Sequence, residues 1–226
     1  MSIEAYNHKI ASGLEGSLPQ TLYTSLRVKR MGITDYLGTW RAMQDFTARR
    51  NAETEDELWL LQHLPVYTLG LNGKSENLPQ DSAAPVIRTD RGGQITYHGP
   101  GQIVAYLLLN LVRLNIGARG LVRLMEESVI DLLEGYGISA QARIDAPGVY
   151  VNGSKIAALG LRIRKGCCYH GLALNVAMDL RPFRVINPCG YPGMRVTQLN
   201  DFGIRDSLEL VSEKLSEKLI YRLHKI

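Results

Sequence analysis

The chain has 226 residues, of which 45% are hydrophobic and 21% charged, and its formal net charge is +4 at pH 7. This length and apolar content suit one sizeable core, so we expect a single domain over residues 1–226, with residues 1–20 as a loosely ordered extension. The basic residues are scattered rather than gathered in a tract, which argues against nucleic-acid binding. A basic segment at residues 162–165 suits either an acidic protein partner or a solvated rim.

The chain shows no sequence signal for a membrane or for secretion. Its longest apolar stretch, residues 103–112, is shorter than the roughly 20 residues that cross a bilayer. The N-terminus lacks an apolar core followed by a small-residue cleavage site, so we expect a cytoplasmic protein. Its three cysteines form neither a disulfide framework nor the paired spacing of a zinc site. We therefore expect reduced thiols, no metal and no other cofactor.

Short apolar runs bounded by turn residues predict the strands of a sheet. They lie at residues 58–61, 66–71, 86–89, 103–111, 149–151, 155–163 and 169–176. The run at 103–111 is apolar on both faces, which places it in the centre of the sheet. The pair Asn152 and Gly153 favours a tight hairpin turn, with Lys155 at the start of the strand that follows. Segments rich in glycine or proline are expected to be loops, at residues 72–85, 91–102 and 181–193.

Apolar residues recur at helical spacing in three segments. The first covers residues 34–53, with a face of Leu37, Trp40 and Met43. The second ends at the glycines 135 and 137, and its face consists of Leu121, Leu124, Met125, Ser128, Leu132 and Tyr136. The third is capped by Asp206 with Glu209, and its buried stripe consists of Leu208, Val211, Leu215 and Leu219. Helices grouped around runs of strands predict an α+β fold with a mixed sheet and packed helices.

The segment RGGQITYHGPGQ at residues 91–102 is the first candidate for a binding site. Its glycines allow main-chain N–H groups to approach a ligand closely, and His98 can hold a carbonyl. The same glycines also suit a long hairpin loop that needs them for geometry alone, so both interpretations stay open. Neither the dinucleotide fingerprint nor a P-loop occurs in the chain, and a nucleotide is therefore not indicated.

Cys189 and Lys155 are the candidates for covalent chemistry. Cys189 lies in NPCGYPG, where prolines and glycines restrict the chain on both sides of the thiol. A thiol with a pKa near 8.5 needs a nearby cation or base to react at neutral pH, and a lysine buried among apolar neighbours can accept a proton. Structural roles remain open for both residues at this point. Cys167 and Cys168 are weaker candidates, because adjacent strand residues point to opposite faces and at least one should be a core residue.

Several blocks of the chain together resemble the lipoate-biosynthesis octanoyltransferases, also called lipoate-protein ligase B. The blocks are RGGQITYHGPGQ at 91–102, PGVYVNGSKIAALG at 147–160, HGLALNV at 170–176 and PCG at 188–190. The resemblance implies a fold like that of the biotin and lipoate ligases, related to class II aminoacyl-tRNA synthetase cores. It also implies transfer of an octanoyl group, without ATP, from octanoyl-acyl carrier protein to a lysine of lipoyl domains. The implied acceptors are 2-oxoacid dehydrogenases and the glycine cleavage H protein.

The resemblance assigns roles to particular residues. It implies that Cys189 carries the acyl group as a thioester and that Lys155 is its catalytic partner. The implied acyl-binding residues are Arg91, Gly92, Gly93, Gln94, Ile95, Thr96, Tyr97, His98, Ala158, Leu159, Gly160, Gly171, Leu172 and Ala173. Two positions depart from the family pattern, since Leu107 replaces an expected proline and Leu172 an expected phenylalanine. The alternative functions are an ATP-dependent lipoate or biotin protein ligase and a noncatalytic binding module.

Overall fold

The computed structural model describes residues 26–73, 83–186 and 194–226. The strands are β1 (Leu26–Thr34), β2 (Asp56–His63), β3 (Val66–Leu69), β4 (Val86–Arg88), β5 (Ile95–His98), β6 (Gln102–Leu108), β7 (Gln141–Ala142), β8 (Gly148–Val151), β9 (Ser154–Arg164) and β10 (Cys167–Asn175). The α-helices are α2 (Tyr36–Arg49), α3 (Ala118–Glu134) and α4 (Leu208–Leu223), and the 3-10 helices are η2 (Arg181–Val185) and η4 (Leu199–Phe202).

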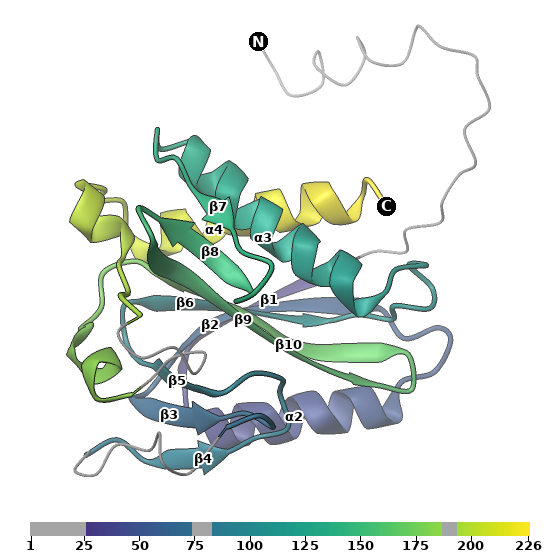
Figure 1. The fold of residues 1–226 in the computed structure, drawn as a ribbon. Coiled ribbons are helices and arrows are strands. Elements are labelled where there is room, and N and C mark those ends of the chain that lie inside the picture. Colours follow the sequence, from purple (N-terminus) through teal and green to yellow (C-terminus); the bar gives the residue numbers. More distant parts are fainter. Residues whose placement is uncertain (1–25, 74–82, 187–193) are drawn as a thin grey trace, which may run out of the picture.

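The described residues form two sheets with helices on both sides. The larger sheet has the order β1-β2-β6-β10-β9-β8-β7, and the smaller sheet has the order β4-β3-β5. Strands β1 and β2 are parallel, as are β3 and β4, whereas the other paired strands are antiparallel. Helices α3 and α4 cover one face of the larger sheet, and α2 lies on the opposite face (Figure 1). The predicted α+β class with a mixed sheet is therefore confirmed.

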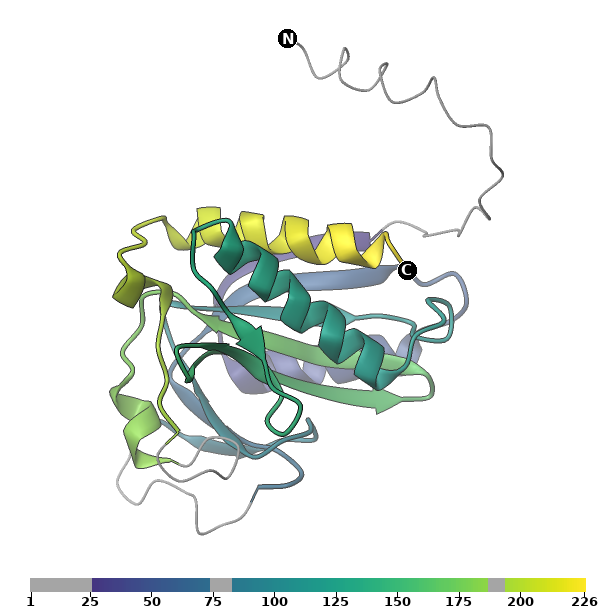
Figure 2. The ribbon, with the colours of Figure 1, turned by 45° about the horizontal axis from the view of Figure 1, so that its top comes forward.

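Strand β6 lies in the interior of the larger sheet, between β2 and β10, and all seven of its residues are buried. This arrangement confirms the central position predicted from its apolar run. One face of β6 contributes to a large core with α3 and α4, which Figure 2 shows running over the sheet. The other face packs in a second cluster with Met43 of α2 and Trp59 of β2. The described helices include none that is both long and apolar enough to cross a membrane.

Helix α2 connects the parallel strands β1 and β2, as a parallel pair requires. Asp35 caps its start by accepting a hydrogen bond from the Gly38 N–H at 2.8 Å. The helix is shorter than the expected 34–53. Its fully buried face is Tyr36, Thr39 and Met43, so the predicted stripe is displaced by about one position, with Leu37 and Trp40 only partly buried.

Other sequence expectations were wrong in detail. The expected loop at 91–102 contains strand β5, and the expected loop at 181–193 begins with η2; residues 187–193 lie outside the described chain. Strands β1 and β7 were not predicted. Helix α4 is capped by Ser207, whose hydroxyl accepts from the Leu210 N–H, because Asp206 pairs with Lys214 instead. The predicted turn at Asn152 and Gly153 is confirmed, since both have positive φ angles of 49° and 76°.

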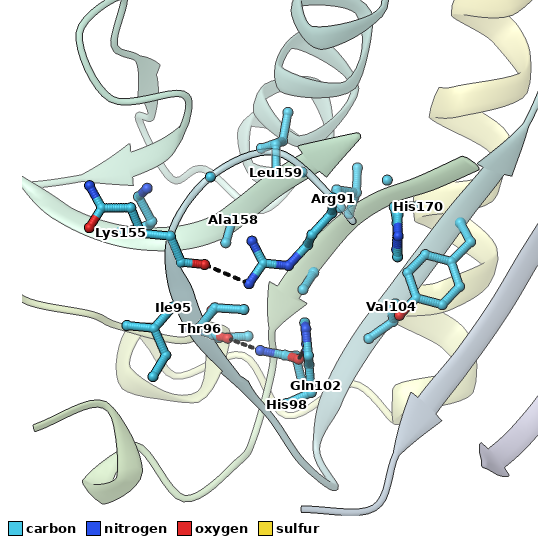
Figure 3. A pocket seen from close by; sticks show the side chains of 18 of the residues that line it. Arg91, Ile95, Thr96, His98, Gln102, Val104, Lys155, Ala158, Leu159 and His170 are labelled. Atoms are coloured by element: carbon cyan, nitrogen blue, oxygen red, sulfur yellow. Dashed lines mark hydrogen bonds between the residues drawn. The ribbon is translucent and has the colours of Figure 1, made fainter. Parts of the chain in front are cut away.

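Three histidines, His63, His98 and His170, are buried close to Tyr36 at the start of α2. The rings of His63 and His98 lie 5.7 Å apart, and Tyr36 stacks on His98 at 6.2 Å. Figure 3 shows His98 and His170 where they face the pocket described below. Burial lowers the pKa of His63 to about 4 and that of His98 to about 3. The rings of His63 and His98 are therefore neutral at physiological pH.

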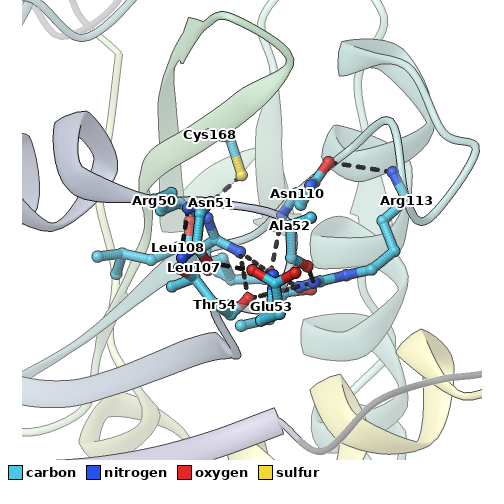
Figure 4. Close-up of polar contacts among 11 residues, drawn as sticks. Arg50, Asn51, Ala52, Glu53, Thr54, Leu107, Leu108, Asn110, Arg113 and Cys168 are labelled. Carbon is cyan, nitrogen blue, oxygen red and sulfur yellow. Dashed lines mark hydrogen bonds and ion pairs between the residues drawn. The ribbon is translucent and has the colours of Figure 1, made fainter.

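A buried ion cluster fixes the loop between α2 and β2 (Figure 4). The Asp56 carboxylate accepts from the guanidinium of Arg50, from Arg113 at 2.7 Å and from the Asn110 N–H at 2.9 Å. The side chains of Arg50 and Asp56 are only 3% and 2% exposed. Arg50 also donates to the Leu108 carbonyl at 2.8 Å. The cluster thus joins the end of α2, the start of β2 and the end of β6.

We expect the protein to lose stability as the pH falls from about 6.5 to about 4. In this range the unfolded histidines bind protons whereas the buried ones do not, so lower pH favours the unfolded state by on the order of 1 kcal/mol per pH unit per histidine. Urea unfolding at several pH values tests this. His63→Gln should flatten the pH dependence, and His224→Gln, at an exposed position, should not. An unchanged slope in the His63 variant contradicts the prediction.

Asp56→Asn should lower the free energy of unfolding by about 3–5 kcal/mol, because it leaves the buried Arg50 guanidinium without its counter-charge. The matched control is Glu55→Gln, which breaks an exposed ion pair with Arg27 and should cost about 0–1 kcal/mol. Denaturant unfolding of both variants provides the measurement. Equal losses in the two variants would show that the cluster contributes no more than a surface pair.

Candidate active site

A pocket lies between the glycine-rich segment 91–94, strand β5 and the facing parts of β6, β9 and β10 (Figure 3). Its volume is about 770 Å³ including the open mouth. Most of the residues singled out from the sequence line it, namely Arg91, Gly93, Gln94, Ile95, Thr96, His98, Lys155, Ala158, Leu159, Gly160, Gly171, Leu172 and Ala173. A pocket with a mainly apolar lining and a few polar groups suits a small ligand with an apolar chain.

Gly92 and Tyr97 are not among the residues that line the pocket. The Gly92 N–H donates to the Leu161 carbonyl of β9 at 2.8 Å, so this glycine joins the segment to the sheet. Tyr97 packs in a separate core cluster against Tyr67 and Phe183, because alternate residues of β5 point to opposite faces. Their expected role in binding is therefore not supported by their positions.

Arg91 holds the glycine-rich segment closed over the pocket. Its guanidinium donates to the Thr68 carbonyl at 2.7 Å, to the Gln94 carbonyl at 2.8 Å and to the Gly92 carbonyl at 2.9 Å. Gly160 permits this arrangement, since a Cβ there would lie 3.1 Å from Arg91 Cδ and 3.3 Å from the Gly92 oxygen. Gly93 has a φ of 86°, a conformation that favours glycine. Gly92, Gly93 and Gly160 thus allow the close approach between segment 91–94 and β9.

His98 belongs to a buried hydrogen-bond network with a defined direction. The Asn175 amide nitrogen donates to the Thr197 carbonyl at 3.0 Å, so its oxygen accepts from the Gln102 amide at 2.9 Å. The Gln102 oxygen must then accept from His98 Nδ1, which lies 2.7 Å away. His98 is therefore a neutral ring protonated at Nδ1. Its Nε2 is then an acceptor, so His98, which lines the pocket, would accept from a ligand at this atom rather than donate to it.

Asp90 organises the neighbouring wall of the pocket. Its carboxylate accepts from Trp40 Nε1 at 2.8 Å, from the Tyr169 hydroxyl and from His170 Nε2 at 3.1 Å. Although burial raises the pKa of Asp90, these hydrogen bonds lower it below its ordinary value. Burial lowers the pKa of His170, and Asp90 opposes that shift. His170 has a φ of 65°, so its backbone is strained where its ring faces the pocket.

Lys155 is a buried amine in the wall of the pocket, with only 3% of the residue exposed. Its Nζ donates to the Pro147 carbonyl at 3.1 Å and lies 5.1 Å from the centre of the Tyr150 ring. Its backbone is bonded to the segment after residue 193, because its N–H donates to the Arg195 carbonyl and its carbonyl accepts from the Thr197 N–H. The lysine is therefore held by its side chain and by its main chain.

Cys189 lies outside the described residues. The chain on both sides of it contributes to the pocket, through Phe183 before it and Val196 after it. Cys168 is fully buried in the core, and burial raises the pKa of its thiol to about 12. This confirms the prediction that at least one residue of the adjacent pair is a core residue. Cys167 is partly exposed and is not among the residues that line the pocket.

Further residues line the pocket that sequence reasoning did not assign to it, including Tyr36, Val104, Tyr106, Asn175, Phe183 and Val196. Strand alternation could have found two of them, because Val104 and Tyr106 lie on the same face of β6 as Gln102. Tyr36 and Val196 come from distant segments and carry no such signal. In the part of the chain that the structure describes, no group of three or more His, Cys, Asp or Glu residues is placed to hold a metal ion.

Comparison with known proteins identifies the family. Residues 35–220 match the lipoyl protein ligase A/B catalytic domain. An octanoyltransferase from Nitrosospira multiformis is 62% identical over 200 residues, which cover 88% of this chain and 93% of that protein.

Solved structures share the fold at low identity. A bi-partite lipoate protein ligase from Thermoplasma acidophilum has a TM-score of 0.71 and 18% identity, and the match covers 89% of this chain and 84% of that chain. A biotin protein ligase from Aquifex aeolicus has a TM-score of 0.57 and 15% identity, with 90% and 72% covered. These likenesses confirm the expected kinship of fold with lipoate and biotin ligases. The catalytic-domain match and the 62% identity over most of both chains show that this chain belongs to the lipoyl protein ligase A/B family, among its octanoyltransferases.

Proposed function

We propose that this chain transfers an octanoyl group from octanoyl-acyl carrier protein to a lysine of lipoyl domains through a thioester on Cys189, with Lys155 handling the proton. The observation that carries this proposal is the placement of Lys155. A lysine that is 3% exposed and lines a largely apolar pocket is unusual, because lysine side chains are mostly exposed in folded proteins. An amine in such a setting suits proton transfer.

The position of the chain around Cys189 supports its role as the nucleophile. Phe183 and Val196 line the same pocket as Lys155, and Val196 forms a parallel bridge with Lys155. The alternative thiols are less suitable, since the Cys168 thiol is buried with a raised pKa and Cys167 is not a lining residue. We therefore assign the covalent step to Cys189.

The first step forms the acyl-enzyme. The Cys189 thiolate attacks the carbonyl carbon of the donor thioester, a new carbon–sulfur bond forms, and the bond to the carrier's sulfur breaks. The carrier leaves as a thiol after it takes up the proton that Cys189 had released to Lys155. One thioester replaces another, so the step is nearly isoenergetic and needs no activation by ATP.

The second step forms the product amide. The acceptor amine attacks the acyl-cysteine carbonyl, a carbon–nitrogen bond forms, and the bond to Cys189 sulfur breaks. Lys155 takes the proton that the attacking amine loses, and the thiolate is restored. The apolar lining residues Val104, Ala158, Ala173 and Val196 suit the octanoyl chain during both steps.

The proposed partners are octanoyl-acyl carrier protein as the donor, and the lipoyl domains of 2-oxoacid dehydrogenases and the glycine cleavage H protein as acceptors. Their identity rests on the family name and on the pocket's fit to an apolar chain. The cytoplasmic location and the absence of nucleic-acid and membrane partners stay predictions from the sequence.

We expect transfer from octanoyl-carrier protein to a lipoyl domain to proceed at full rate in ATP-free buffer. The donor is already a thioester, whereas a ligase must first form an adenylate. Intact-mass analysis of the lipoyl domain, with and without ATP and free octanoate, makes the comparison. Octanoylation that requires ATP would assign the chain to the ATP-dependent ligases.

Cys189→Ala should abolish both the acyl-enzyme and the turnover, because no other thiol can take its place. Denaturing mass spectrometry after mixing with octanoyl-carrier protein detects the adduct. Cys167→Ala, at a partly exposed site, serves as the matched control and should keep the adduct. An adduct that persists in the Cys189 variant removes that residue from the scheme, and no adduct in the wild type supports a binding module.

Lys155→Met should lower kcat/KM by about 10²–10⁴-fold, the usual contribution of a positioned acid–base group. The methionine keeps the length and the apolar stem of the lysine, so the fold should persist, which circular dichroism checks. Lys214→Met is the control, since Lys214 pairs with Asp206 near Tyr136 and is not among the pocket's lining residues. A normal rate in the Lys155 variant at neutral pH contradicts its assignment.

A further inference from the structure

A single peptide group separates Lys155 from an acid on the neighbouring helix. The carbonyl oxygen of Pro147 accepts a hydrogen bond from Lys155 Nζ at 3.1 Å. The N–H of the same peptide, which belongs to Gly148, donates to Glu126 Oε1 at 2.9 Å. In a trans peptide the carbonyl and the N–H lie in one plane and point in opposite directions, so the carboxylate and the ammonium lie at opposite edges of one peptide group.

We propose that Glu126 is a positioning residue for Lys155: its carboxylate anchors the Pro147–Gly148 peptide that holds the amine, and its charge favours the ammonium form. This inference rests on the proposed role of Lys155 and adds a residue that does not line the pocket. The carboxylate accepts a hydrogen bond from the peptide N–H, and the ammonium donates one to the carbonyl of the same peptide. Both interactions polarise that peptide in the same direction. Glu126 therefore acts on Lys155 through the backbone and through space.

Glu126 occupies a place in α3 where an acid needs a specific reason. The residue is only 8% exposed, and the helix packs its buried face against a core of apolar side chains. Burial of a carboxylate is costly unless it is hydrogen-bonded or paired with a charge. Gly148 and Lys155 supply both conditions. Burial raises the pKa of Glu126, and the Gly148 N–H and the Lys155 ammonium oppose that shift.

The backbone at Gly148 is shaped for this contact. Its φ is 146°, and a Cβ there would lie 3.0 Å from Lys155 Cε and 3.1 Å from Lys155 Nζ. A side chain at this position would displace the lysine, so the lysine stem lies directly against the peptide. Tyr150, held by a hydrogen bond from its hydroxyl to the Ala146 carbonyl at 2.7 Å, packs beside the amine.

The charged groups near this pair come from several elements. From α3 come Glu126 and its neighbour Glu127, which raises the pKa of Glu126 but is itself paired with Arg123 and Arg222. The ring of Tyr150 in β8 packs beside the amine, and Arg91 contributes a second cation to the lining of the same pocket. Glu126 is the acid of this set that contacts the peptide holding Lys155.

The test is the titration of Lys155 in Glu126→Gln. The glutamine oxygen can still accept from the Gly148 N–H, so the fold should persist and only the charge is lost. Competitive labelling with acetic anhydride across the pH range, with peptide mass analysis, reports the pKa of Lys155 directly. We expect Lys155 of the variant to react with the reagent at lower pH than in the wild type, and the pH profile of kcat/KM to move in the same direction. An unchanged or raised Lys155 pKa overturns the proposal.

Two further variants test whether the change at Lys155 is caused specifically by the charge of Glu126. Glu127→Gln removes the same charge from the next residue of α3, and we expect less than half the shift of the Glu126 variant. Glu126→Asp keeps the charge but shortens the side chain, so Lys155 should titrate close to the wild type while kcat falls. A shift in the Glu127 or the Asp variant as large as in Glu126→Gln contradicts the specific action of the Glu126 charge.

The outcome for Glu126 is separable from that for the covalent route. Labelling reads Lys155 without any substrate, so a shift in Glu126→Gln stands even where Cys189→Ala keeps its adduct and the proposed function fails. The reverse result, a Cys189-dependent adduct with no Lys155 shift, leaves the proposed function intact and rejects the positioning role.

Discussion

The pocket depends on the burial of one guanidinium. Arg91 joins the smaller sheet, through Thr68, to the glycine-rich segment, and Gly92 joins that segment to β9 of the larger sheet. Arg91 donates hydrogen bonds to carbonyl and hydroxyl oxygens, which solvate its buried charge. A buried polar group must be bonded in this way, so the two sheets are held at a fixed separation. The space between them is the pocket.

The buried side chains of His63 and His98 and the polar groups that they contact are neutral and form hydrogen bonds with one another. His63 bonds to Tyr106, and His98 bonds through Gln102 to Asn175 and the Thr197 carbonyl. A neutral, bonded network presents few free donors to an alkyl chain, which keeps the pocket floor compatible with apolar ligands. In the proposed reaction, the chemistry takes place where Lys155 lines the cavity.

Local sequence signals predicted the elements whose conformation depends mainly on their own residue types. The Asn152–Gly153 turn and the central strand β6 were found because positive φ and two-sided burial leave direct traces in residue type. Strand β5 was missed because glycines surround its four residues. Strand β1 was missed because it is an edge strand of mixed exposure whose partner, β2, lies beyond a helix.

The sequence predicted most of the residues of the candidate site but not the contacts among them. Sequence blocks placed most of the lining residues correctly, since the glycines of segment 91–94 and of β9 exist for one close approach. The pairing of Glu126 with the Pro147–Gly148 peptide had no sequence signal, because it joins a helix to a loop 22 residues away. His98 lines the pocket as predicted, but its hydrogen bond to Gln102 could not be read from the sequence. Long-range hydrogen bonds of this kind follow only from the fold.

The main-chain bridge between Lys155 and Val196 connects two distant parts of the sequence by hydrogen bonds. Six residues, 190–195, separate Cys189 from this bridge. The number of residues between Cys189 and this bridge is a property of the sequence that the strands of the two sheets do not set. Under the proposed mechanism, variants that lengthen or shorten this stretch would change activity while the strands and helices stayed the same.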